Sequence, residues 1–231
     1  MTDFIQFGSK KIDFRVDFTG RKSLGITVTH ELEVFVKAPI DTPIDKIKEK
    51  VKKKAPWIIK QQSFFISFYP KNIPKKFLAG ETHLYRGRQY RLKVEIATLE
   101  SIKLKDGFIT VLTQTKERVE QLVKEWYLKN ARQKFSSIAQ PLIEQFAKYG
   151  VHPESIVLRE MPNRWGSCTP KGKIILNPEL IKAPKGCIEY VIIHELCHLV
   201  HRGHTQKFMD LQSKEMPHWE KWKRKLEQLL A

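Results

Sequence analysis

A short histidine and glutamate pattern near the C-terminus has the spacing of a metal site. Residues 194–198 read H-E-L-C-H, an H-E-x-x-H pattern that follows the apolar run 190–193. On a helix, His194 and His198 share one face, because residues four apart differ by only about 40° around the axis. Both imidazoles can therefore bind one metal ion. Glu195 is offset from His194 by about 100°, where it can hold and deprotonate a metal-bound water.

Zinc is the ion that suits this pattern. Neutral imidazoles are typical ligands of Zn²⁺ in an open tetrahedral site. Zinc lowers the pKa of a bound water to about 7 and polarises the scissile carbonyl. Glu195 would then have only a modest proton transfer to perform. The pattern predicts one zinc ion per chain and a hydrolytic reaction.

A catalytic zinc site needs a third protein ligand, and His204 is the best candidate. It lies six residues after the second histidine of the pattern, as in the longer signature H-E-x-x-H-x-x-G-x-x-H. Gly203 can supply the turn that brings this side chain back toward the helix. His201 stands where that signature has glycine, so the turn must differ in detail. A carboxylate on the next helix, Glu215 or Glu220, is the alternative third ligand.

Other side chains near the pattern could take part in the reaction. Arg164 is our choice for stabilising the oxyanion of a tetrahedral intermediate, ahead of Asn163 and Tyr190. Cys168 could approach the zinc as an inhibitory ligand. Cys197 lies inside the pattern but is rotated off the histidine face, so we expect it to be a small core residue.

A peptide substrate could pair with an exposed strand through main-chain hydrogen bonds. Residues 165–168 or residues 173–177 could form that edge strand. Gly166 would permit the close approach of another backbone. The alternative is an ordinary hairpin that packs Trp165 into the core.

Apolar periodicity predicts the elements that position these residues. The metal pattern falls in a strongly apolar helix from about 187 to 201. Two histidines and a glutamate inside such a helix would be costly without a metal or other partners. Short strands at 155–160 and 173–177 precede this helix, and helices at 206–214 and 219–230 follow it.

The N-terminal part alternates in the manner of strands. Short β-branched and aromatic runs at 4–7, 12–16 and 33–36 predict a β meander. A capping sequence then starts a helix over 44–66, with a lysine-rich stretch that we interpret as a solvated face. Pro56 is expected to kink or divide this helix.

The middle of the chain returns to strands before it becomes helical. Strands are predicted at 83–85 and 90–94, and a hairpin at 103–113. From residue 116 the apolar residues fall at helical spacing as far as 138, and Pro141 is expected to start or kink a second segment. No internal repeat is apparent in the sequence.

Composition narrows the class of protein. The chain has 231 residues, 41% of them hydrophobic, including 13 Phe and 5 Trp, which is enough for a sizeable core and too apolar for a disordered protein. No apolar run approaches the ~18 residues of a membrane span. The three cysteines make a poor disulfide framework, and the N-terminus lacks the features of a signal peptide. We therefore expect a cytoplasmic protein.

Net charge supports an alternative function. Lys and Arg number 42 against 25 Asp and Glu, giving +17, and the excess is spread along the chain. A field of this sign favours encounters with nucleic acid, anionic membrane or acidic proteins. The alternative is therefore a protein that binds nucleic acid through its basic surface.

The chain resembles the YgjP-like metallopeptidases, a zincin family of predicted metal-dependent hydrolases. SprT-like and Wss-type proteases, some of which act at DNA, look like more distant relatives. The segments that carry the resemblance are 164–168 (RWGSC), 172–177 (GKIILN) and 190–199 (YVIIHELCHL), then His204 and Phe208, with 85–92 (YRGRQYRL) similar to the family's β-hairpin. The resemblance implies that His194, His198 and His204 bind zinc and that Glu195 is the general base.

These observations predict an α+β protein in two parts. Residues 1–115 would form a mostly β region with one basic helix, and residues 116–231 a zincin-like helix–strands–helix domain. The predicted function is zinc-dependent hydrolysis of peptide bonds in a peptide or protein substrate. One alternative is a nucleic-acid-associated protein in which the zincin fold is regulatory or inactive. Another is hydrolysis of a non-peptide amide.

Overall fold

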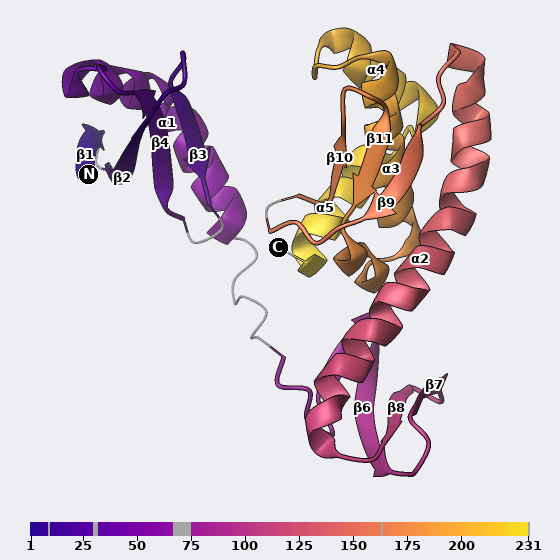
Figure 1. The fold of residues 1–231 in the computed structure, drawn as a ribbon. Helices are drawn as coiled ribbons and strands as arrows, with labels where there is room; N and C mark the ends of the chain where they lie inside the picture. Colours follow the sequence, from indigo (N-terminus) through magenta and orange to yellow (C-terminus); the bar gives the residue numbers. More distant parts are fainter. Residues whose placement is uncertain (9, 30–31, 67–74, 163, 231) are drawn as a thin grey trace. The chain divides into compact units, whose positions relative to one another are not determined.

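The chain folds into two compact units, Met1–Asn72 and Ile73–Leu230 (Figure 1). The computed structural model describes residues 1–8, 10–29, 32–66, 75–162 and 164–230, without the side chains of 64–66. Strands and helices are mixed in both units, so the predicted α+β class is confirmed. Among the described helices, none combines the length and the apolar character that crossing a membrane requires.

The first unit contains a four-stranded sheet with one parallel pair. Its strands are β1 (Thr2–Phe7), β2 (Lys10–Thr19), β3 (Gly25–Val28) and β4 (Val34–Pro39), in the order β1-β2-β4-β3. The pairs β1–β2 and β3–β4 are antiparallel, whereas β2 and β4 are parallel. The three predicted runs are strands, but the sequence analysis missed β3. The meander prediction was wrong, because β3 forms the edge and β4 inserts between β2 and β3.

Helix α1 (Ile44–Ile66) closes the core of this unit. Its buried residues recur at helical spacing and belong to the same apolar cluster as the inward-facing strand residues; they are Ile47, Val51, Ala55 and Ile58. Pro56 lies inside the helix, which continues through it. The lysines at 46, 50 and 52–54 are exposed, so the predicted solvated face is confirmed.

The second unit begins with a sheet that repeats this topology. Its strands are β5 (Thr82–Tyr85), β6 (Arg88–Ile96), β7 (Ser101–Lys105) and β8 (Phe108–Thr113), in the order β5-β6-β8-β7. The outer pairs are again antiparallel and the central pair again parallel. Each sheet is followed by a long helix. The structure therefore contains a repeated β-β-β-β-α arrangement that the sequence does not reveal.

Helix α2 (Val119–Phe146) follows a short 3₁₀ turn and joins two layers of the second unit. Its buried residues run along the whole helix: Val119, Val123, Tyr127, Ala131, Phe135, Ile138, Ala139 and Phe146. They share one cluster with β6 and β8 residues and with the apolar helix near the C-terminus. The compact units consequently divide after Asn72 and not near residue 115. The change from strand to helix near 115 is real, but one core spans it.

The last third of the chain forms a small sheet covered by helices. Strands β9 (Ser155–Leu158), β10 (Gly166–Cys168) and β11 (Lys173–Leu176) have the order β10-β11-β9. A 3₁₀ segment (Pro178–Lys182) then leads to α3 (Lys185–Val200), which packs on this sheet and against α2. Helices α4 (Gln206–Glu215) and α5 (Trp219–Leu230) pack on α3 (Figure 1). The predicted strands and helices of this region are thus present.

Candidate metal centre

Helix α3 presents two histidines on one face. Most of this helix is buried, including the residues Ile192, Ile193 and Leu196, which anchor it in the core. His194 and His198 are half-buried, one turn apart. The chain leaves the helix at His201, whose backbone is extended. The following loop carries the third histidine back toward this face.

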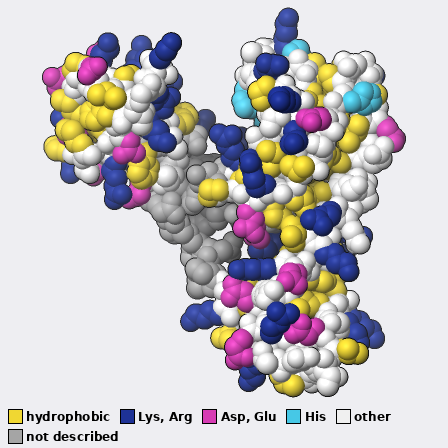
Figure 2. Space-filling view, viewed as in Figure 1, with side chains coloured by type: hydrophobic (Ala, Val, Ile, Leu, Met, Phe, Trp, Pro, Cys, Tyr) yellow, Lys and Arg dark blue, Asp and Glu magenta, His cyan; other side chains and the backbone are white. Residues whose placement is uncertain are grey.

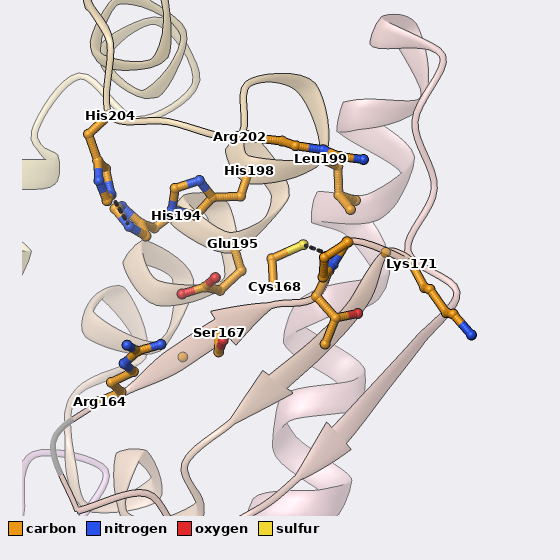
Figure 3. A pocket seen from close by; sticks show the side chains of 14 residues that line it. Arg164, Ser167, Cys168, Lys171, His194, Glu195, His198, Leu199, Arg202 and His204 are labelled. Carbon is orange, nitrogen blue, oxygen red and sulfur yellow. Dashed lines mark hydrogen bonds between the residues drawn. The ribbon is translucent and has the colours of Figure 1, made fainter. Parts of the chain in front are cut away.

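The three histidines singled out in the sequence meet at one point (Figure 3). Each of His194, His198 and His204 offers a ring nitrogen, and the three nitrogens lie within 4.8 Å of one another. Nε2 of His204 lies 3.1 Å from Nε2 of His194. Two such nitrogens face each other favourably only with a proton or a cation between them. Within the part of the chain that the structure describes, these three histidines are the one group of His, Cys, Asp or Glu side chains close enough together to hold a metal ion.

Hydrogen bonds orient two of these rings. Nδ1 of His194 donates to Oε1 of Gln212, at 2.7 Å, and Nδ1 of His198 donates to the backbone carbonyl of His201, at 3.3 Å. Both acceptors lack a proton to give, so each Nδ1 must carry the hydrogen. Each Nε2 is then left with a free lone pair, which is how metal-binding histidines are usually prepared.

Phe208 on α4 forms the floor beneath the three rings. It is fully buried. Its ring centroid lies 5.0 Å from that of His194, 4.6 Å from that of His198 and 4.8 Å from that of His204. Packing against one rigid aromatic ring limits the rotamers that the three imidazoles can adopt. Phe208 therefore fixes where the ring nitrogens converge.

The histidines of α3 are held in their neutral form. Burial, together with the neighbouring His198 and His204, lowers the pKa of His194 to about 4, although the hydrogen bond to Gln212 acts in the opposite direction. Burial also lowers the pKa of His198. Neutral imidazoles have the lone pair that a metal ligand needs. The site is therefore ready for a cation near pH 7.

Glu195 lies beside the histidines, between α3 and β10. Its side chain is only 5% exposed, and this burial raises its pKa to about 7, although the positive charge of Arg164 acts in the opposite direction. A carboxyl group with a near-neutral pKa can both accept and return a proton. Figure 3 shows its carboxyl group next to the histidine cluster and facing the pocket.

Gly166 on β10 gives Glu195 its space. A Cβ atom at this glycine would lie 2.6 Å from Oε1 of Glu195 and 2.8 Å from Cγ1 of Val191. The strand can approach α3 this closely because residue 166 has no side chain. Gly166 was expected to permit the approach of another backbone, whereas in the structure it accommodates the carboxylate of Glu195.

Strand β10 lies at the edge of its sheet, and β11 lies in the centre. Of the two strands considered for pairing with a substrate, the structure therefore leaves β10 available. Trp165, just before it, is half-buried and packs against the core, as the hairpin alternative expected. The two expectations are compatible, because the edge of a sheet can be open while its flank is packed, and pairing with a substrate stays a prediction.

The histidines and Glu195 open into a pocket of about 690 Å³. Its lining includes Arg164 and Cys168, with Cys168 half-buried and outside the histidine cluster. The buried amide of Asn177 donates to the backbone carbonyl of Arg164, at 3.1 Å, and so holds this arginine at the start of β10. Tyr190 does not line the pocket and stacks on Trp219, with 13° between the rings. Asn163 lies outside the described residues.

The two carboxylates considered as alternative ligands lie elsewhere. The side chain of Glu215 is 2% exposed and accepts hydrogen bonds from α2 and the turn after it. Its donors are Gln145 at 2.6 Å, Lys148 at 3.0 Å and Tyr149 at 2.5 Å. Glu220 is exposed at the start of α5. Glu215 therefore fastens α4 to α2, and α4 carries Gln212 and Phe208.

Sequence reasoning missed the roles of Gln212, Glu215 and Asn177. Each has a side chain that is mostly buried and hydrogen-bonded, and Gln212 falls four residues after Phe208 on the same face of α4. A polar residue on the apolar face of α4 is the signal that could have indicated a buried amide with a hydrogen-bond partner. The partner itself lies on another helix and could not be read from α4. Cys197 is fully buried, so the expectation of a core residue is confirmed.

Comparison with known proteins adds one finding. The family model described as YgjP-like, metallopeptidase domain, matches residues 22–229, which extends through both compact units. No curated protein and no solved structure is significantly similar to the chain.

Proposed function

We propose that this chain hydrolyses peptide bonds with the help of a zinc ion. The proposal starts from the family, because the chain belongs to the YgjP-like metallopeptidases. In this proposal His194, His198 and His204 hold the ion and Glu195 is the general base. The observation that carries the proposal is the convergence of three imidazole nitrogens within 4.8 Å, next to a buried carboxyl group. The family makes the protein a metal-dependent peptidase, and the choice of zinc and of these residues is ours.

The donor set fits zinc. Three imidazoles without a carboxylate are ligands that suit Zn²⁺ better than Mg²⁺ or Ca²⁺. Zinc–nitrogen bonds of about 2.0–2.1 Å at tetrahedral angles separate two ligand nitrogens by about 3.3 Å. The 3.1 Å between Nε2 of His204 and Nε2 of His194 is close to that value. When bound, zinc would supply a Lewis acid that acidifies a water and polarises a carbonyl.

The protein's own groups would carry the proton and orient the substrate. Glu195 can take a proton from the attacking water and pass it to the leaving amine, since its pKa is raised to about 7 by burial. Arg164 reaches from the start of β10 toward Glu195 (Figure 3) and is proposed to stabilise the oxyanion. The open edge of β10 is proposed to pair with the backbone of the substrate.

The nucleic-acid alternative has less support. Figure 2 shows Lys and Arg side chains scattered over the visible face, interspersed with Asp and Glu. A surface of this kind raises encounter rates with polyanions without forming a defined site. The family match, in contrast, points to peptide or protein substrates. We therefore do not place nucleic-acid binding in the proposed function.

Metal content tests the proposed ligands. Elemental mass spectrometry on gently purified protein should find about one zinc per chain, and His204→Ala should lose it or bind it much more weakly. His218→Ala is the matched control, because His218 is exposed and outside the cluster. Retention of zinc by His204→Ala would remove that residue from the ligand set.

Turnover tests the proposed base. Glu195→Gln should keep the metal while cleavage of a panel of peptides and unfolded proteins falls by about 10²–10⁴-fold. Glu220→Gln, at an exposed position, is the control. Cleavage of non-peptide amides alone, dependent on Glu195, would replace the peptidase proposal with the non-peptide alternative. Equal peptide cleavage by wild type and Glu195→Gln would overturn the role of this residue.

A further inference from the structure

The exposed charged residues that line the pocket at the candidate metal centre are all cationic. Its three cationic lining residues, Arg164, Lys171 and Arg202, are all exposed. Glu195 is the acidic residue among the described residues that line it, and it is 5% exposed. Field lines concentrate in a cleft with walls of low polarity, so this arrangement attracts anions into the pocket more than an open surface would.

Two of these cations lie away from the proposed oxyanion side. Figure 3 shows Arg164 at the start of β10, and Arg202 and Lys171 on the opposite side of Glu195 and Cys168. Arg202 follows α3 in the loop that leads to His204, and Lys171 lies in the turn between β10 and β11. Both residues line the pocket and come from separate elements, on the side of Glu195 and Cys168 that lies away from Arg164.

Arg202 and Lys171 have no anionic partner in the part of the chain that the structure describes. Neither takes part in an ion pair there, although ion pairs are frequent elsewhere, as between Lys148 and Glu215 at 3.0 Å. The positive charge of Arg202 acts on Cys168, which lines the same pocket. A guanidinium group that is free on a pocket wall can bind a carboxylate with two parallel hydrogen bonds.

We propose that Arg202, assisted by Lys171, selects substrates that carry a carboxylate beside the scissile bond. This inference rests on the proposed peptidase function and names the class of substrate. The carboxylate can belong to an Asp or Glu side chain or to the C-terminus of the substrate, because both present the same group. A peptide that lies along β10 extends toward Arg202 and Lys171 at one end, where either carboxylate would be bound.

Binding to the full-length Glu195→Gln protein, loaded with zinc, tests this selection without turnover. The probes are fluorescent octapeptides with both ends blocked, in which one Glu replaces Gln at each position in turn. Anisotropy should show about fivefold tighter binding when Glu occupies one or two adjacent positions. A second arm compares the all-Gln peptide with a free and with an amidated C-terminus, and so distinguishes the two sources of carboxylate.

Charge reversal identifies the residue responsible. Arg202→Glu in the same background should abolish the preference or transfer it to peptides with Lys at the same positions. The matched control is Lys103→Glu, which changes the net charge equally at an exposed position on β7 outside the pocket. A preference that falls equally in both variants would come from the overall charge of +17 and would overturn the inference.

The proposed function and this inference fail separately. Glu195-dependent cleavage without any carboxylate preference in either arm would overturn only the inference. A preference that depends on Arg202, in a protein that cleaves no peptide, would overturn only the peptidase function. Absence of measurable binding by every Glu-containing and free-carboxylate peptide would also overturn the inference.

Discussion

The two four-stranded sheets of this protein share a strand order and differ in the helix that follows each. In the first unit, the buried residues of α1 belong to one cluster with residues of β1–β4. In the second unit, the buried residues of α2 share a cluster with β6 and β8, and also with α3, α4 and α5. Helix α1 has 23 residues and α2 has 28, which correspond to about 35 Å and about 42 Å.

This difference shows that the same β-β-β-β-α arrangement can form a core by itself or can support a further layer of the protein. The buried residues of α1, from Ile47 to Ile58, complete the core of their own sheet. In α2 the stripe continues past Tyr127 to Phe146, so a second layer can pack on the same helix. That second layer contains the candidate metal centre. The sheet β5–β8 is thereby tied to the site through a shared core, whereas β1–β4 has a core of its own.

The largest expected effect tests whether the two cores are independent. Phe135→Ala removes a fully buried ring from the core that α2 shares with α3 and should destabilise the second unit by about 3–5 kcal/mol. Ile47→Ala should destabilise the first unit by about 2–5 kcal/mol and leave zinc content unchanged. Scanning calorimetry with metal analysis measures both. A single transition shifted equally by both variants would contradict the division into two units.

A smaller effect is expected from crowding the site through a glycine. Gly166→Ala places a methyl group against Oε1 of Glu195 and should lower turnover by about 100-fold with zinc retained, because small displacements of a catalytic group are costly. Gly20→Ala in the first unit is the control, since a Cβ there meets nothing within 4 Å. Steady-state kinetics on the same peptide panel measures both variants. Unchanged turnover in Gly166→Ala would show that the carboxylate can move without loss.

The smallest effect concerns the carboxylate that ties α4 to α2. Burial of Glu215 raises its pKa, but hydrogen bonds from Tyr149, Gln145 and Lys148 outweigh this and leave the pKa lowered. A lowered pKa in the folded state means that the carboxylate stabilises the protein above its unfolded pKa, and that this stabilisation is lost as the pH falls through the folded value. Glu215→Gln should therefore lower the free energy of unfolding by about 2 kcal/mol at pH 7.

The pH dependence supplies the check on this prediction. In urea unfolding of the second unit, the difference between wild type and Glu215→Gln should shrink as the pH falls below about 4.3, the pKa of an unperturbed Glu, and through the lowered pKa of the folded state. Glu33→Gln in the first unit is the comparison, because Glu33 is 41% exposed and pairs with Arg15 at 3.0 Å on the surface. Its effect should stay within about 1 kcal/mol. A difference for Glu215→Gln that does not vary with pH would exclude a role for its charge.

Local patterns in the sequence determined the elements that carry the site. The spacing of His194 and His198 follows directly from helical periodicity, and the buried apolar run before them identified α3. Most strands and helices were predicted for the same reason, since each depends on neighbours two to four residues away. The resemblance to the YgjP-like family was also local in origin, and the family match confirms it.

Contacts between distant segments were decided only by the tertiary structure. The parallel pairing of β2 with β4, the division after Asn72 and the core that α2 shares with α3 involve residues far apart in the chain. The same holds for the hydrogen bond from His194 to Gln212 and for the fit of Gly166 against Glu195. Periodicity shows which face of an element is apolar but not which partner covers it, because that choice depends on the packing of the whole core. The sequence therefore determined which reactive side chains are present at this site, and the packing of α4 and β10 against α3 decided how those side chains are oriented.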